Sequence, residues 1–147
     1  MKSLFVAAFL FLAVPGLASA QIMEMNGTWK LSPERTLGPA PKEETIVYII
    51  KPGEQGYTMD SIEADGRKGH VEWKATYDGR DHPTPSGNGS TVSLKKLDSH
   101  TELVTNKRSG KVTSTYTRVL VDDGKTIMSI GRNAANNVIW VRVFEKQ

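Results

Sequence analysis

The chain has 147 residues, of which 38% are hydrophobic and none is cysteine, and its formal net charge is +3 at pH 7. This length suits one domain, and without cysteine its stability must come from a packed core, since disulfides and lipid anchoring through a cysteine are excluded. The basic residues form no run longer than a pair, so the clustered basic surface that nucleic-acid binding needs is also excluded.

Residues 1–20 have the pattern of a secretory signal peptide. Lys2 gives a positive start, residues 4–14 form an apolar run too short to span a bilayer, and Ala18-Ser19-Ala20 supplies small residues for cleavage. We therefore expect cleavage before Gln21 and a periplasmic or secreted location. No other apolar stretch approaches membrane-spanning length, and a cysteine-free exported chain with this cleavage site points to a bacterial protein.

The mature domain, residues 21–147, shows the pattern of β-strands separated by turns. Segments rich in Val, Ile, Thr and Tyr alternate with Asp-Gly, Ser-Gly and Pro-Gly pairs, which supply the backbone conformations that tight turns need. No segment repeats apolar residues at helical spacing. In chain order we predict strands at 26–31, 43–51, 56–63, 68–77, 91–97, 101–108, 111–121, 125–132 and 137–145, with a short tenth strand through 79–83.

Two links between these strands are too long for hairpins. Residues 32–42 carry three prolines, so we expect an extended crossing loop there rather than a helix. Residues 83–90 are rich in Gly, Pro and Ser and are expected to form a mobile loop. The remaining links suit antiparallel hairpins, so the chain is a meander.

A meander of this length twists, and closure removes its two exposed edges. Alternation within the strands supports one buried and one wet face; Val92 and Leu94, for example, oppose Ser93 and Lys95. The predicted fold class is therefore all-β: a single antiparallel up-and-down β-barrel of about nine to ten strands. We expect a monomer.

Three short motifs resemble the fatty-acid-binding proteins, which share the calycin superfamily with the lipocalins. Residues 27–31 (Gly-Thr-Trp-Lys-Leu) resemble that family's first strand, and residues 118–125 resemble its Arg-x-x-x-Asp-Gly-Lys hairpin with one extra residue. Residues 142–146 (Arg-Val-Phe-Glu-Lys) resemble its Arg-x-Tyr-Glu-Lys terminus. The mature chain also looks like a group of small exported bacterial lipocalin-like proteins, which share a Tyr-Asp-Gly segment, here residues 77–79, and a Glu-Lys-Gln end.

The resemblance implies a site. In the fatty-acid-binding proteins two arginines and a tyrosine project into the cavity and hold the ligand carboxylate, which a guanidinium matches with two parallel hydrogen bonds. Arg118 and Arg142 match the arginines, whereas Phe144 stands where the tyrosine would be, so one hydroxyl donor is missing. That family also inserts a helix-turn-helix lid after the first strand, and residues 32–42 leave no room for it.

From these motifs and the aromatic residues between them we predict the ligand-binding residues, the rest of the cavity wall and the residues that close the base. The predicted ligand-binding residues are Arg118, Arg142, Tyr116, Trp140, Phe144 and Trp73. The cavity wall would be completed by Tyr48, Tyr57 and Met128. The residues expected to close the base of the barrel are Gly27 and Trp29.

Three of these residues have an alternative role. Trp29 could contact a ligand, although a plug packed under the barrel is the favoured interpretation. Either Arg118 or Arg142 could stack across Trp29 and close the base through a cation–π interaction, as an arginine does in lipocalins.

The two faces of the last strand separate two functions. Trp140, Arg142 and Phe144 share one face, and Val141 and Val143 share the other. If the aliphatic face points inward, the aromatic face forms an exposed patch with the composition of a protein-binding hot spot. If the aromatic and arginine face points inward, the barrel is suited to a ligand.

Patterns for catalysis or metal binding are missing from the sequence. The three histidines have no metal-ligand spacing, there is no Gly-x-Ser-x-Gly, and the carboxylates are scattered as on a solvated surface. We therefore expect a non-catalytic exported barrel, without metal or cofactor, that binds or carries a small hydrophobic ligand; a fatty acid is the example with an acidic head group. The alternative is a protein-binding module, such as a periplasmic inhibitor-like barrel, with a side-chain-filled interior. A cavity of several hundred Å3 would support the carrier.

Overall fold

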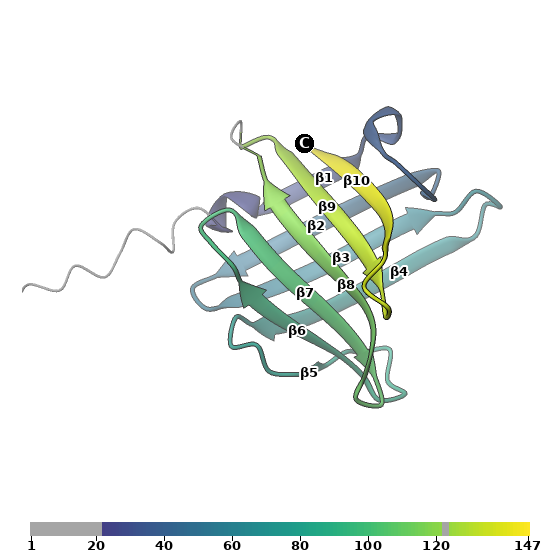
Figure 1. Cartoon of the computed structure of the whole chain (residues 1–147). Coiled ribbons are helices and arrows are strands. Elements are labelled where there is room, and N and C mark those ends of the chain that lie inside the picture. Colours follow the sequence, from purple (N-terminus) through teal and green to yellow (C-terminus); the bar gives the residue numbers. More distant parts are fainter. Residues whose placement is uncertain (1–21, 122–123) are drawn as a thin grey trace, which may run out of the picture.

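The computed structural model describes residues 22–121 and 124–147, and the predicted signal peptide lies outside the described residues. The described residues form one antiparallel sheet that curls into a barrel (Figure 1). Its strands are β1 (Gly27–Leu31), β2 (Glu43–Lys51), β3 (Glu54–Ile62), β4 (Lys68–Thr76), β5 (His82–Pro83), β6 (Ser90–Lys96), β7 (Thr101–Arg108), β8 (Lys111–Leu120), β9 (Thr126–Asn133) and β10 (Val138–Lys146). Two 3-10 turns accompany them, η1 (Ile22–Met25) and η2 (Pro33–Arg35).

The sheet joins the two ends of the chain. Its strand order is β4-β3-β2-β1-β10-β9-β8-β7-β6-β5, so the first and last strands are neighbours, with Trp29 opposite Lys146 and Leu31 opposite Phe144. The sheet's two outer strands, β4 and β5, lie close together, but no ladder joins β4 to β5 or β6. The result is a nearly closed up-and-down barrel, which confirms the predicted fold class.

The strand bounds agree with the predicted ones to within two residues except at the tenth strand. Residues 79–83 were expected to form it, and only His82 and Pro83 do. The residues before it belong to a turn, in which Asp78 accepts a hydrogen bond from the Arg80 N–H at 2.9 Å and Gly79 donates to the Leu94 carbonyl at 3.0 Å.

The long link after β1 forms no lid. Apart from η2 it is extended, and Leu37 pairs with Val141 through two backbone hydrogen bonds of 2.8 and 2.9 Å, so the segment continues along β10. Gly38 follows with φ of +82°, and a Cβ there would lie 2.8 Å from the Ile139 carbonyl oxygen. A side chain at this position would therefore strain the backbone and prevent the close approach.

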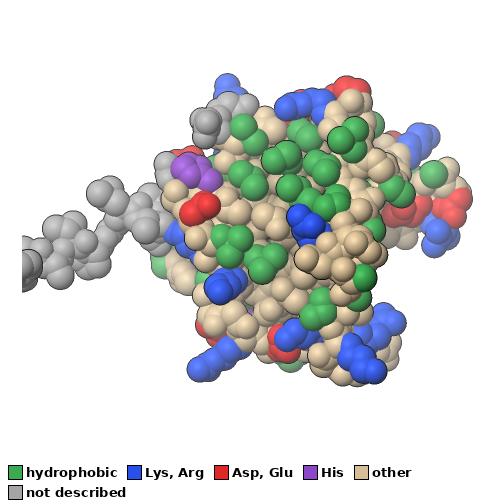
Figure 2. All heavy atoms as spheres, viewed as in Figure 1, with side chains coloured by type: hydrophobic (Ala, Val, Ile, Leu, Met, Phe, Trp, Pro, Cys, Tyr) green, Lys and Arg blue, Asp and Glu red, His purple; other side chains and the backbone are tan. Residues whose placement is uncertain are grey.

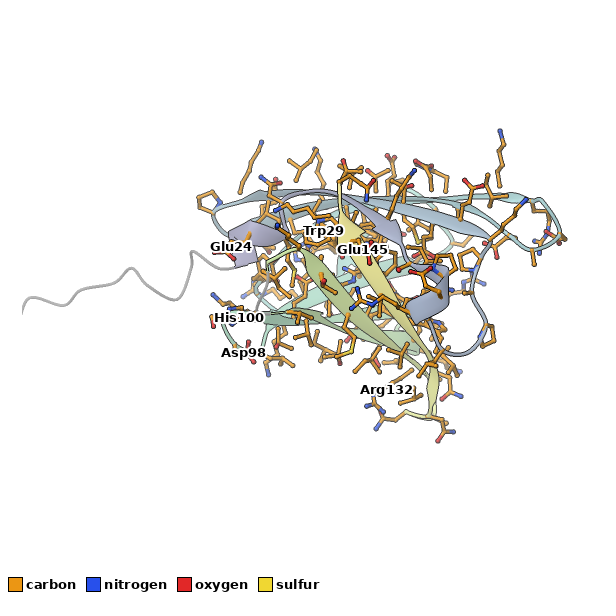
Figure 3. The ribbon with its side chains drawn as sticks, turned by 90° about the horizontal axis from the view of Figure 1, so that it is seen from above. Glu24, Trp29, Asp98, His100, Arg132 and Glu145 are labelled. Atoms are coloured by element: carbon orange, nitrogen blue, oxygen red, sulfur yellow. The ribbon has the colours of Figure 1, made fainter. Side chains whose placement is uncertain are left out.

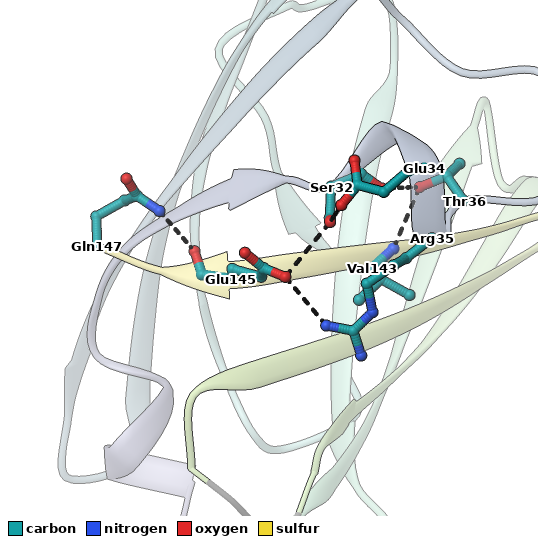
Figure 4. A network of polar contacts seen from close by, with 7 residues as sticks. All are labelled: Ser32, Glu34, Arg35, Thr36, Val143, Glu145 and Gln147. Atoms are coloured by element: carbon teal, nitrogen blue, oxygen red, sulfur yellow. Dashed lines mark hydrogen bonds and ion pairs between the residues drawn. The ribbon is translucent and has the colours of Figure 1, made fainter.

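A polar network holds this segment against β10 (Figure 4). Glu145 accepts hydrogen bonds from Arg35 at 3.1 Å and from the Ser32 hydroxyl at 3.4 Å, and Thr36 Oγ1 accepts one from the Val143 N–H at 3.5 Å. Ser32 also bonds to the Glu34 carboxylate, which lowers the pKa of Glu34. The network fixes the path that a helical lid would otherwise take.

One end of the barrel is closed by packed side chains. Figure 3 shows Glu24 and Trp29 toward this end, which we call the base, and Arg132 toward the opposite end, which we call the mouth. Trp29 is fully buried, and its indole N–H donates to the Met25 carbonyl at 2.7 Å. The fully or almost fully buried aliphatic residues of the core include Ile50, Val92, Leu94, Val104, Leu120 and Ile127.

The outer surface is mixed in character. Hydrophobic side chains gather over the strands that face the viewer in Figure 2, which is the view of Figure 1, and charged side chains lie around them. Among the described residues, no helix is long and apolar enough to cross a membrane.

Candidate functional site

The last strand turns its aromatic and arginine face inward. Trp140, Arg142 and Phe144 line a cavity inside the barrel, while Val141 and Val143 lie on the other face. Val143 is nevertheless buried, and its backbone is hydrogen-bonded by the segment after β1, which runs beside β10. The direction of Trp140, Arg142 and Phe144 answers the question that the sequence left open.

The cavity has a volume of about 740 Å3, in the range of small-molecule sites. It opens beside β4, where residues 70–72 face residues 84–86 and the ends of β7 and β8 across the interrupted ladder. All six residues predicted to bind a ligand line it: Trp73, Tyr116, Arg118, Trp140, Arg142 and Phe144.

Two other predicted wall residues lie elsewhere. Tyr48 is fully buried beside Tyr57, with ring centroids 5.5 Å apart, and does not reach the cavity. Met128 was placed wrongly, because the neighbouring Ser129 lines the cavity and Met128 pairs with Val143 on the outer face. The outer face is apolar here as well, so the character of Met128 did not reveal its direction.

Two pairs of aromatic rings build the wall. Tyr57 and Trp73 stack with centroids 4.7 Å apart and planes at 15°, and Tyr116 lies 5.3 Å from Trp140. Gly131 makes the second pair possible, because a Cβ on this residue would overlap the Trp140 indole. Such rings supply a large apolar contact area with few rotatable bonds.

Arg118 lies at the floor of the cavity and is 3% exposed. Its guanidinium carbon is 4.5 Å from the centroid of Tyr57, and its Nη1 donates to Glu102 at 3.1 Å. Burial alone would lower the pKa of Arg118, but the nearby Tyr48, Tyr57 and Glu102 raise it above its usual range. Arg118 is therefore charged and held in place.

Glu102 collects hydrogen bonds from three elements below the cavity. It is fully buried, and besides Arg118 it accepts from the Tyr77 hydroxyl at 3.1 Å and from Gln55 Nε2 at 3.5 Å. Burial and the Glu102 charge raise the pKa of Tyr77, so this hydroxyl stays a donor. A buried carboxylate is tolerated when it is paired and hydrogen-bonded in this way.

Arg142 is paired in a similar way nearer the mouth. Its Nη1 forms an ion pair with Glu44, and its guanidinium carbon lies 4.4 Å from the Trp140 ring centroid. Burial raises the pKa of Glu44, and the charge of Arg142 opposes that rise. Each arginine that the sequence offered as a ligand clamp thus already holds a carboxylate of its own chain.

The charged side chains form one row across the barrel wall. Glu102, Arg118, Ser129 and Arg142 are consecutive cross-strand partners on β7, β8, β9 and β10. Since neighbouring strands lie about 4.8 Å apart, the backbones of the two arginines are separated by roughly 10 Å. Ser129 sits between them and also lines the cavity.

Two buried polar atoms of the cavity wall have no hydrogen-bond partner within residues 22–121 and 124–147. They are Arg142 Nε and Thr91 Oγ1, both from residues that line the cavity. Buried polar groups are usually satisfied, so these two atoms are exceptions in the wall, and protein atoms cover both of them.

Neither arginine stacks across Trp29. Lys146 lies there instead, with its Nζ 5.3 Å from the Trp29 ring centroid and 2.9 Å from the Glu24 carbonyl oxygen. Gly27 lies beside the same side chain, with φ of +121° and the Lys146 Cε 3.7 Å from the position of a Cβ. The base is thus closed by Trp29 and Lys146.

Solved structures with the same architecture include the wild-type fluorescent protein UnaG, with a TM-score of 0.61, 16% identity, and coverage of 86% of this chain and 99% of UnaG. A Schistosoma mansoni fatty acid binding protein in complex with arachidonic acid has a TM-score of 0.59 and 12% identity, with coverage of 87% of this chain and 99% of that protein. Zebrafish ileal bile acid-binding protein complexed with cholic acid has a TM-score of 0.55 and 10% identity, with coverage of 84% of this chain and 99% of that protein. The chain has the fold of the fatty-acid-binding proteins. No protein-family model matches it, and no curated protein sequence does.

The structure departs from that family's expected features at the site. Residues 32–42 form no helix-turn-helix lid, and Phe144 occupies the tyrosine position, fully buried and without a hydroxyl. The proposed closer similarity to exported bacterial lipocalin-like proteins stays a prediction.

Sequence reasoning missed Glu44 and Glu102, because it treated the carboxylates as solvated. The signal was present in the alternation of their strands. Glu44 shares a strand face with Ile46 and Tyr48, and Glu102 shares one with Val104. A carboxylate on an apolar face, in a barrel with two unassigned arginines, indicates a buried ion pair.

Proposed function

We propose that the protein is a non-catalytic exported barrel that binds or carries a small, mostly apolar ligand. The observation that carries the proposal is the cavity of about 740 Å3, in which aromatic rings and two paired arginines build the inner wall and hydroxyl, amide and charged side chains line the rest. Sites for small molecules have this character, with the apolar wall giving affinity and the polar groups giving orientation.

Two structures with the same fold contain such ligands, arachidonic acid in one and cholic acid in the other. They support the proposal that this barrel also holds a small ligand, and both are binding proteins by name. A fatty acid is the finer form of the proposal that the sequence suggested. Export to the periplasm or the medium is proposed from residues 1–20 alone.

The protein-binding alternative would use residues 32–42 or 83–90 as its surface, together with a patch formed by Trp140 and Phe144. Both of these aromatic residues line the cavity, so the patch is not part of the outer surface. The cavity itself favours a small ligand over a side-chain-filled interior.

The proposal is tested by titrating the protein with the uncharged fluorescent probe N-phenyl-1-naphthylamine. We expect saturable binding of one probe per protein, detected by its fluorescence and by energy transfer from tryptophan. Trp140→Ala should weaken binding about tenfold, the loss of one good anchor residue. Ile139→Ala is the matched control, since Ile139 is the neighbouring exposed residue on the outer face.

Decanoic acid is then used to displace the probe and test the fatty-acid form. If its affinity is unchanged in Arg118→Ala and Arg142→Ala, neither arginine binds the carboxylate. The absence of saturable probe binding by the unmodified protein would overturn the carrier proposal as a whole.

A further inference from the structure

The charged groups of the cavity form ion pairs with one another, and this pairing limits the charge that a ligand can carry. At the floor Arg118 is paired with Glu102, and nearer the mouth Arg142 is paired with Glu44. Glu102 and the Glu44 side chain are at most 4% exposed, so solvent screens these carboxylates little. An acidic ligand would therefore meet two arginines whose charge is already neutralised.

The groups around the mouth continue this balance. Lys107, which lines the cavity, has its Nζ 2.9 Å from Asp81, and His70 bonds to Asp60 at 2.7 Å. Arg108 and Glu72 line the opening from opposite sides with opposite charges, and both are exposed. Positive and negative side chains therefore alternate around the mouth.

A bound carboxylate would have two options, and both are unfavourable. It could displace Glu44 from Arg142 and leave a buried glutamate unpaired, or it could enter beside the existing pair and add a charge without a partner. An uncharged oxygen faces neither problem, because it leaves both ion pairs intact and adds no charge.

We propose that this cavity selects apolar ligands with an uncharged oxygen, a hydroxyl or a carbonyl, over ligands with a carboxylate, and that Glu44 is the residue that determines this selectivity. The inference rests on the proposed function, since it concerns the head group of the ligand in the same cavity. It assigns Arg142 to the protein's own glutamate.

The test compares two ligands of equal chain length, 1-decanol and decanoic acid, as competitors of N-phenyl-1-naphthylamine at pH 7.5. We expect decanol to bind at least about tenfold more tightly, because an unpaired carboxylate in apolar surroundings costs more than the free energy that a factor of ten represents. Equal affinities, or tighter binding of decanoate, would contradict the proposal without any variant.

The variant Glu44→Gln tests whether Glu44 determines the selectivity. It leaves the charge of Arg142 uncompensated, so the affinity for decanoate should rise at least about tenfold while that for decanol changes by less than about threefold. In Glu44→Gln/Arg142→Gln the gain should disappear. Glu43→Gln is the matched control, because Glu43 is the adjacent exposed residue on the outer face of β2.

The outcomes separate this inference from the proposed function. If the probe binds and both competitors displace it equally well in every variant, the cavity binds ligands and the head-group selectivity is wrong. If Glu44→Gln gains no affinity for decanoate, Glu44 does not determine the selectivity. If the probe does not bind to the unmodified protein, the proposed function itself is wrong, and the inference falls with it.

Discussion

The base and the mouth of this barrel are built from similar residues but put them to different use. At the base Trp29 is fully buried among aliphatic side chains and its indole N–H is satisfied within the chain. Toward the mouth Trp140 is only partly buried, and it lines the open cavity. The same residue type therefore contributes to stability at one end and is available for binding at the other, and the buried Arg118–Glu102 pair lies between the two regions.

The strongest test of this division exchanges tryptophan for alanine at each end. Trp29→Ala should lower the free energy of unfolding by about 3–5 kcal/mol, the usual cost of removing a large buried aromatic side chain. Trp140→Ala should cost clearly less, because the cavity already leaves one side of its ring without packing partners. Denaturant unfolding of both variants measures the difference, and equal losses would show that the mouth is packed as tightly as the base.

The ion pair between the two regions should behave as a unit. Arg118→Met leaves Glu102 buried and unpaired, and we expect it to cost about 3–5 kcal/mol. In Arg118→Met/Glu102→Gln the unpaired charge is absent, so the double variant should be more stable than the sum of the single losses by roughly 1–3 kcal/mol. A double-mutant cycle measures this coupling; additive losses would mean that the pair is not coupled.

A substitution at Gly131 tests how tightly Trp140 is packed in the cavity wall. Gly131→Ala places a methyl group where the Trp140 indole lies, so the indole must move, and we expect a loss of about 1–3 kcal/mol and weaker probe binding. Gly56→Ala is the control, since a Cβ there meets no atom closer than 3.5 Å. Unchanged probe binding in Gly131→Ala would show that the position of Trp140 does not matter for binding.

The smallest expected effect lies at the rim of the mouth. The hydrogen bond from His70 to Asp60 raises the pKa of His70 above its ordinary value of 6.5. Its contribution to stability is therefore fully present below pH 6.5 and is lost as the pH rises through the raised pKa. NMR titration of the imidazole should give a value above 6.5 that falls in Asp60→Asn; an unchanged value would remove Asp60 as the cause.

Most of the fold could be predicted from the sequence, because hairpin turns and strand alternation are local. The extended link at residues 32–42 followed from its prolines, and the closure that brings residues 29–31 beside residues 144–146 followed from the length of the meander and the need to remove its exposed edges. The one large error in strand length, at residues 79–83, lies where the turn around Asp78 competes with pairing.

The site was predicted less completely, because the direction of a side chain depends on what covers the other face. The inward face of β10 could not be decided from its own residues, because both of its faces carry large apolar side chains. Met128 was assigned to the cavity for the same reason, since an apolar residue suits either face. Glu44 was missed because its role depends on Arg142, which is 98 residues away in the chain.

The three tryptophans provide the most direct test of the central claim that the hollow end binds a small apolar ligand. In the NMR spectrum of the protein labelled with nitrogen-15 in its indole groups, each tryptophan gives one N–H signal. On addition of 1-decanol to saturation, the signals of Trp73 and Trp140 should shift while that of Trp29, which is bonded to Met25 at the base, stays in place. Shifts of all three signals together, or of none, would contradict the account.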